Sequence, residues 1–220
     1  MCIFIKGNLI IMDHKRTLSA LLCLTMLSGL ASCSKTEESG TSATAATVTE
    51  STASSESETS GPSHLSGFEY INTLKSFEVT SNDLKDGVWS DINANKIDAN
   101  KSPDLSWEAV DGAGLYVIFM IDPDAGYWLH WKSDAITETS LAEGQATRQE
   151  YVGPYPPPGS THTYDVYVFA LKAPVERVRG LLNGSNDRIE EFILALDTDA
   201  NGNSGNMIAC GRLSGTYTEK

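Results

Sequence analysis

The strongest apolar run of the chain covers residues 115–121, which read Leu, Tyr, Val, Ile, Phe, Met and Ile. It is rich in β-branched and aromatic residues and stops at Asp122-Pro123-Asp124, a pattern typical of a buried central strand. Residues 164–171 form a second run of the same kind and predict a second buried strand. Weaker patterns predict strands over residues 77–80, 105–108, 129–135 and 207–218.

Helical spacing of apolar residues is clearest over residues 188–196, which predict an amphipathic helix. Residues 175–182 predict a second, shorter helix. The strands outnumber these helices and do not alternate with them regularly, which argues against a parallel α/β fold. We therefore expect a mainly β fold (β-rich α+β) with one or two peripheral helices.

The N-terminal part of the chain has the pattern of an export signal. Lys15 and Arg16 precede an apolar run over residues 18–30, and the run ends in Leu-Ala-Ser-Cys33. The run is shorter than the roughly 20 residues that span a membrane as a helix. Leu-Ala-Ser-Cys resembles the lipobox of bacterial lipoproteins, whose cysteine is lipidated and becomes the new N-terminus. The alternative is an ordinary signal peptide with an unrelated cysteine.

The composition then divides the chain into three parts. Residues 34–66 are dominated by Ser, Thr, Ala and Glu and contain no aromatic residue, which is typical of a disordered tether. We predict a lipoprotein-type signal peptide over residues 1–32, with Met12 as a possible start, followed by lipidated Cys33 and the tether to residue 66. A domain over residues 67–220 would then lie in the cell envelope, outside the cytoplasm.

Charge argues against a nucleic-acid-binding protein, and the cysteine content argues against a disulfide in the domain. The chain has 16 Lys and Arg against 29 Asp and Glu, a net charge of −13, so it would repel the phosphate backbone of a nucleic acid. Once the signal and the lipidated cysteine are set aside, Cys210 has no cysteine partner. We expect it to be a buried, unreactive thiol.

The two histidines of the domain, His130 and His162, stand beside the most distinctive polar segments. Asp122 and Asp124 end the first buried strand, and their side chains would point the same way if the backbone stayed extended. The Gly- and Pro-rich residues 153–159 form a stiff loop that could build a pocket wall. The alternative is a Pro-rich connection beside a purely structural Asp–His pair.

Several short motifs in this order resemble the phosphatidylethanolamine-binding protein family, and its bacterial, Raf-kinase-inhibitor-like branch in particular. They extend over about residues 68–218 and are more specific together than singly. The motifs are Ser102-Pro103-x-Leu105-Ser106-Trp107, Asp122-Pro123-Asp124-Ala125, Trp128-x-His130, Gly153-Pro154 with Gly159-x-x-His162-x-Tyr164, and residues 207–217. The resemblance implies a large central antiparallel sheet with a smaller sheet, and a small cavity that accepts phosphate or phosphorylated head groups.

Carried over by motif position, the resemblance also names the residues that would line this cavity: Asp122, Pro123, Asp124, Trp128, His130, Tyr151, Gly153, Pro154, Pro156, His162 and Tyr164. The sequence departs from the family pattern at Gly126, where Pro is usual, and at Thr163, where Arg is usual. Without that Arg the two aspartates have less compensating charge, so phosphate should bind more weakly or the ligand should differ. Replacing Thr163 with Arg would then raise phosphate affinity.

These observations favour a lipid-anchored, non-enzymatic module that binds a small anionic or phosphorylated ligand, with no cofactor and no metal. One alternative is a protease or kinase inhibitor. A second is a metal-dependent hydrolase that uses Asp122, Asp124, His130 and His162, although no nucleophile accompanies them. Residues 197–204 imitate the start of an EF-hand loop, but Ile208 stands where a bidentate Glu belongs, so a polar turn is the preferred interpretation.

Overall fold

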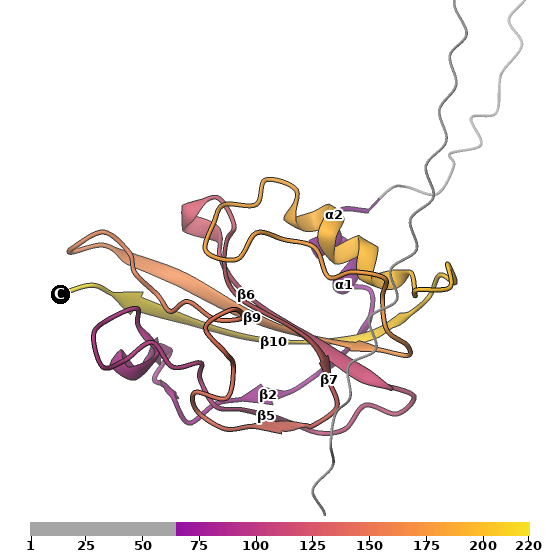
Figure 1. The fold of residues 1–220 in the computed structure, drawn as a ribbon, viewed down its shortest axis with the longest axis horizontal. Coiled ribbons are helices and arrows are strands. Elements are labelled where there is room, and N and C mark those ends of the chain that lie inside the picture. Colours follow the sequence, from indigo (N-terminus) through magenta and orange to yellow (C-terminus); the bar gives the residue numbers. More distant parts are fainter. Residues whose placement is uncertain (1–64) are drawn as a thin grey trace, which may run out of the picture. The chain divides into compact units, whose positions relative to one another are not determined.

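Three layers make up residues 65–220, the part of the chain that the computed structural model describes. A large sheet lies in the middle, a small sheet covers one of its faces, and two short helices cover the other (Figure 1). Residues 1–64 lie outside the described part, and with them the predicted signal peptide, Cys33 and nearly all of the predicted tether. None of the helices in residues 65–220 is long and apolar enough to cross a membrane.

The large sheet has seven strands in the order β3-β4-β10-β9-β6-β7, with β1 added to β10. Its strands are β1 (Lys75–Phe77), β3 (Leu84–Lys85), β4 (Val88–Trp89), β6 (Leu115–Asp122), β7 (Trp128–Ile136), β9 (Thr161–Leu171) and β10 (Met207–Thr218). The long strands pair antiparallel, whereas the short β1 and β4 both run parallel to β10. The sheet is therefore mixed at β10 and antiparallel elsewhere.

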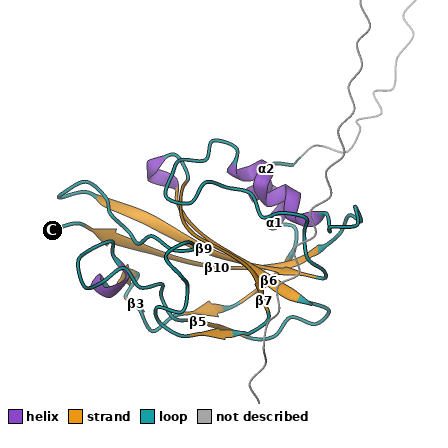
Figure 2. Cartoon of the chain, viewed as in Figure 1, coloured by secondary structure: helices purple, strands orange, loops and turns teal. Residues whose placement is uncertain are grey.

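The small sheet has the order β2-β5-β8 and consists of β2 (Val79–Thr80), β5 (Leu105–Trp107) and β8 (Ser140–Leu141). The helices are α1 (Gly67–Ile71) and α2 (Ile189–Leu194), drawn in purple in Figure 2. Three 3-10 turns, η1 (Asp91–Asn93), η2 (Pro123–Ala125) and η3 (Ala195–Asp197), complete the elements. The mainly β fold class is confirmed.

The alternation of side chains along β9 explains its apolar run, which only Asp165 interrupts. Tyr164, Val166 and Val168 point toward the small sheet, while Tyr167 and Phe169 point toward the helices. Because both faces of β9 are covered, the positions from Tyr164 to Leu171 are apolar on both faces, with Asp165 as the exception. The same holds for β6, all eight residues of which are buried.

The two strong strand predictions are confirmed as β6 and β9, and the weaker ones correspond to β1 with β2, β5, β7 and β10. Residues 77–80 do not form one strand, because the chain leaves the large sheet after Phe77 and enters the small sheet at Val79. The helix predicted over residues 188–196 is confirmed as α2 with η3. The capping box of Ser66 and Glu69 begins α1, a helix that the apolar pattern did not predict.

The short helix predicted over residues 175–182 is wrong. This segment is a loop whose backbone bonds to the sheet and to its own turn instead of forming helical bonds. The Lys132 ammonium donates to the Gly180 carbonyl over 2.7 Å, and the Leu181 N–H donates to Asn186 Oδ1, also over 2.7 Å. Gly180 has a φ of 115°, which no helix contains.

Candidate functional site

A cavity of about 310 Å³ opens at the end of the large sheet where β6 ends and β7 and β9 begin. The strands supply Asp122, His130 and His162, and the Pro-rich loop after β8 supplies a wall. Residues that line it are Asn95, Asp122, Ala125, Trp128, His130, Val152, Gly153, Tyr155, Pro157, His162 and Asn183. The volume is at the lower end of the range for small-molecule sites, about 300 Å³ upward.

The buried polar centre of the cavity is the pair of Asp122 and His162. Asp122 is 2% exposed, and its Oδ2 lies 2.7 Å from His162 Nδ1. Since the ionised carboxylate only accepts hydrogen bonds, His162 Nδ1 carries the proton and donates it. His162 Nε2 makes no hydrogen bond to any residue of the described part, so it is the ring nitrogen left for a ligand.

His130 is held in the same manner by the backbone. On β7, its Nδ1 lies 2.8 Å from the carbonyl oxygen of Val152 and 3.2 Å from that of Gly153. Both partners accept, so Nδ1 carries the proton and Nε2 is again free. Burial lowers the pKa of His130 below its ordinary value, against the smaller opposing effects of these carbonyls and of Asp122. His130 is therefore a neutral imidazole at neutral pH.

The loop that holds His130 is anchored on three sides. The Val152 N–H donates to the His130 carbonyl over 2.8 Å, and the Gly153 N–H donates to Asn100 Oδ1 over 2.7 Å. The Asn95 N–H donates to the Pro154 carbonyl over 2.9 Å. A Cβ at position 153 would lie 1.9 Å from a backbone oxygen, so this position requires glycine.

Five of the eleven residues carried over from the family line the cavity: Asp122, Trp128, His130, Gly153 and His162. The other six lie elsewhere: Pro123, Asp124, Tyr151, Pro154, Pro156 and Tyr164. Tyr151 belongs to the core, where its hydroxyl donates to the Asn93 carbonyl over 2.8 Å and its ring packs edge-on against Trp131. Pro154 and Pro156 are buried in the loop behind the wall, and Pro123 is exposed outside it.

Tyr164 lies beneath the two imidazoles. Its ring centroid is 5.1 Å from that of His130 and 6.5 Å from that of His162. The hydroxyl is fully buried and has no hydrogen-bond partner in residues 65–220. Burial and the nearby Asp122 carboxylate raise the pKa of Tyr164 well above its ordinary value. Tyr164 thus keeps its proton and supports the histidines from below.

Asp122 and Asp124 do not point the same way, because the chain turns into η2 directly after Asp122. The Asp122 carboxylate accepts from the Ala125 N–H over 3.1 Å and begins this turn. Asp124 is exposed and accepts from the Thr163 N–H over 2.7 Å. Thr163 lies on the face of β9 opposite to His162, so an arginine there would stand beside Asp124 and away from the cavity.

Six residues outside the carried-over set complete the cavity: Asn95, Ala125, Val152, Tyr155, Pro157 and Asn183. Two of them, Tyr155 and Pro157, belong to the loop over residues 153–159 that the sequence predicted as a pocket wall. Asn183 has a φ of 57°, and its Oδ1 accepts from Trp128 Nε1 over 3.3 Å. The dipeptide Asn183-Gly184 is a turn signal that could have located this loop, though not its position beside β7.

The alternative of a metal site concerns Asp122, Asp124, His130 and His162. Among residues 65–220, no three His, Cys, Asp or Glu side chains lie close enough together to hold a metal ion. In the EF-hand-like segment, Asp199 accepts from the N–H groups of Asn201 and Asn203, and Asp197 accepts from those of Gly205 and Met207. These carboxylates close a polar turn. Cys210 is buried, and burial raises its pKa to about 12.

Two solved structures are similar to this chain. The chain is similar to Escherichia coli YbcL, described as a new member of the mammalian PEBP family, at 25% identity and a TM-score of 0.50, over 66% of this chain and 99% of that one. It also matches a phosphatidylethanolamine-binding protein homolog of Chlamydia trachomatis at 22% identity and a TM-score of 0.48, over 66% and 99% of the two chains.

The family model described as phosphatidylethanolamine-binding protein matches residues 72–207. The matched segment is more than half of the chain. It also contains every residue that lines the cavity. The chain therefore belongs to the phosphatidylethanolamine-binding protein family.

Proposed function

We propose that this protein is a non-enzymatic binding module that holds a small phosphorylated or otherwise anionic group in the cavity of His130 and His162. Family membership supports a ligand-binding role in general. The specific proposal rests on the hydrogen bonding of the two imidazoles, which is the same in both. Each is fixed through Nδ1, and each keeps Nε2 free in one small cavity.

This arrangement makes anion binding depend on a proton. A neutral imidazole offers a lone pair at Nε2, and a phosphate dianion also offers lone pairs, so the two cannot bond without a proton between them. The ligand can keep that proton, or an imidazole can take it up. Asp122 beside His162 offsets the positive charge that such uptake would create. The Asn183 amide, whose oxygen already accepts from Trp128, has its N–H groups left to donate.

Affinity for phosphate, phosphoethanolamine and sulfate should rise as the pH falls from about 8 to about 6. The complex holds more protons than the free protein and ligand, so lowering the pH favours it, by up to about tenfold per pH unit for one proton. Burial lowers the pKa of His130 and so favours its neutral form in the free protein, which leaves this imidazole able to take up a proton when the anion binds. Calorimetry in two buffers of different ionisation enthalpy would measure the uptake. Sulfate, a dianion throughout, isolates the proton taken by the protein.

Three variants test whether the pH dependence of anion affinity arises in the cavity. His162→Gln and His130→Gln should each weaken binding and reduce the proton uptake measured with sulfate. Thr163→Arg, on the opposite face of β9, should change phosphate affinity by less than about threefold, because its charge would be matched by Asp124. Affinity that does not vary with pH, or that survives both glutamine variants unchanged, would show that the anion binds elsewhere.

We further propose that the module is attached to a membrane through lipid on Cys33 and faces away from the cytoplasm. The support is the sequence pattern of residues 15–33 alone. Cys33→Ala should move the protein from the membrane fraction to the soluble fraction, or leave an unprocessed precursor. Stable attachment needs more than one acyl chain, so the intact mass of the wild type should show several. Equal fractionation and the same processed mass for both proteins would contradict the anchor.

A further inference from the structure

The loop that carries Asn95 to the anion cavity is attached by side chains to the end of β10 and to Glu219, which follows it. The Tyr217 hydroxyl donates to Asp91 Oδ1 over 2.8 Å. The Lys96 ammonium lies 3.3 Å from Glu219 Oε2 and 5.3 Å from the centre of the Tyr217 ring, which adds a cation–π contact. We call these four side chains the clamp: Asp91, Lys96, Tyr217 and Glu219.

The clamp lies beside the strand that carries His162. Tyr217 pairs directly with His162 across β10 and β9, so the two side chains are on the same face of the large sheet. The Glu219 carbonyl also accepts from the Gly159 N–H over 2.9 Å, at the end of the Pro-rich loop. The clamp therefore connects the loop of Asn95 to the part of the sheet from which His162 reaches the cavity.

Asn95 has a free side-chain amide at the cavity. It is exposed and lines the cavity, and its amide makes no hydrogen bond to any residue of the described part. Its backbone N–H donates to the Pro154 carbonyl over 2.9 Å, and Asn100 of the same loop accepts from the Gly153 N–H over 2.7 Å. These bonds hold the loop against the cavity wall on one side, and the clamp holds it on the other.

We propose, on the basis of the anion binding proposed above, that Asn95 donates to the bound anion and that the clamp positions it. An amide donates without taking up a proton, so it complements the two imidazoles. A hydrogen bond of this kind requires the donor to lie about 3 Å from the anion oxygen. By restricting the loop before the anion arrives, the clamp lowers the entropy cost of ordering Asn95 on binding.

Two clamp residues carry negative charge, which makes the sign of their effect informative. By charge alone, removing Asp91 or Glu219 would strengthen the binding of an anion nearby, whereas loss of positioning would weaken it. Replacing Tyr217 with Phe changes no charge and removes only the bond to Asp91. The side chains of Lys96 and Glu219 are 31% and 15% exposed, so loss of their ion pair should change the stability of the fold little.

Sulfate affinity of the full-length chain should be measured by calorimetry at pH 6, at a temperature where every variant is folded. Asn95→Ala should weaken sulfate binding by about fivefold, as expected for the loss of one hydrogen bond. Tyr217→Phe and Glu219→Met should each weaken it by about threefold or more, the second against the change in charge. Lys96→Arg keeps the charge and the cation–π contact and should bind within about twofold of the wild type.

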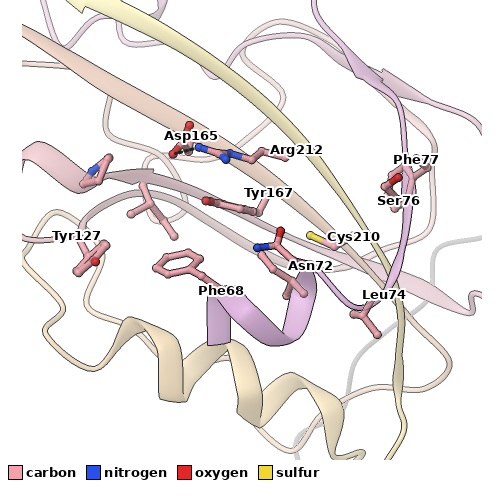
Figure 3. A pocket seen from close by; sticks show the side chains of 13 residues that line it. Phe68, Asn72, Leu74, Ser76, Phe77, Tyr127, Asp165, Tyr167, Cys210 and Arg212 are labelled. Atoms are coloured by element: carbon pink, nitrogen blue, oxygen red, sulfur yellow. Dashed lines mark hydrogen bonds and ion pairs between the residues drawn. The ribbon is translucent and has the colours of Figure 1, made fainter. Parts of the chain in front are cut away.

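Arg212→Met is the matched control from the same strand. Arg212 pairs with Asp165 over 2.8 Å on the opposite face of the large sheet, in a hollow beside α1 (Figure 3). Loss of this pair leaves the buried Asp165 carboxylate without its partner, so it should lower the free energy of unfolding more than the clamp variants do. The hollow shares no residue with the anion cavity, so sulfate affinity should stay within about twofold.

The possible failures are distinguishable. If the wild type binds neither sulfate nor phosphate, the proposed function is wrong and the role of the clamp with it. If the wild type binds both, but Asn95→Ala, Tyr217→Phe or Glu219→Met binds as tightly, the positioning of Asn95 is wrong while the anion cavity stands. Tighter binding by Glu219→Met would show that Glu219 acts through its charge alone. An equal loss of affinity in Arg212→Met would show that affinity follows the general stability of the fold.

Discussion

Gly153→Ala should lower the free energy of unfolding by about 3 kcal/mol and should weaken anion binding at the same time. The added Cβ would lie 1.9 Å from the Asn93 carbonyl oxygen, and both sides of this contact are backbone, so no side-chain rotation can relieve it. The loop has to move as a unit. His130 then loses the two carbonyl acceptors that hold its Nδ1. Chemical denaturation and phosphate calorimetry on the same variant would measure both effects.

Gly159→Ala is the matched control in the same loop. Gly159 has a φ of 79° but no atom within 4 Å of the position that a Cβ would take. Its substitution should therefore cost only the strain of a left-handed residue, about 1 kcal/mol, and should leave phosphate affinity unchanged. If the two variants lose the same stability, the close approach of Gly153 to the Asn93 carbonyl is not what fixes the loop.

Asp122→Ala should lower the free energy of unfolding by about 3 kcal/mol, because two donors lose a buried charged acceptor. These donors are the Ala125 N–H, which begins η2, and His162 Nδ1. Hydrogen bonds to charged groups each contribute about 1.5–3 kcal/mol, and part of this is recovered when His162 reaches solvent. Urea unfolding at neutral pH is the measurement.

Asp124→Ala is the companion variant from the same motif. The Asp124 carboxylate is exposed and bonds one N–H, that of Thr163, so its removal should cost less than about 1 kcal/mol. Asp122→Asn keeps an oxygen for the Ala125 N–H but can turn its amide toward His162. We expect His162 to move its proton to Nε2 in that variant, which ¹⁵N chemical shifts of the ring would detect. If Asp122→Ala and Asp124→Ala lower the free energy of unfolding equally, the buried Asp122 carboxylate stabilises the fold no more than the exposed Asp124 carboxylate does.

The sequence predicted best those strands whose structure depends on burial alone. β6 and β9 are covered on both faces, so their runs are apolar apart from Asp165 in β9 and identify them directly. The start of β9 is different. Residues 161–163 are polar, and they are strand because β10 pairs with them along its whole length. This pairing joins segments that are far apart in the chain, so a local sequence pattern cannot predict it.

The residues of the candidate site also include some that could be predicted from the sequence and some that could not. Asp122 and His130 were carried over from the family motifs, and the structure brings them to one cavity. Asn95 and Asn183 come from loops whose places are fixed by backbone bonds to Pro154 and Leu129, so their arrival at the cavity could not be predicted. Tyr151 was assigned to the lining wrongly. It pairs with Trp131 and turns into the core, which leaves its neighbour Val152 at the cavity.

The pairing of β10 also determines when the domain can fold during synthesis. The last strand of the chain lies between β9 and the early strands β1 and β4, and Lys75 pairs with Ala209 across most of the domain's sequence. Until translation reaches this strand, β1 has no partner in the large sheet, β4 pairs only with β3, and β9 has one bare edge. Contacts between such distant residues form slowly. The large sheet can therefore close only after β10 has been synthesised.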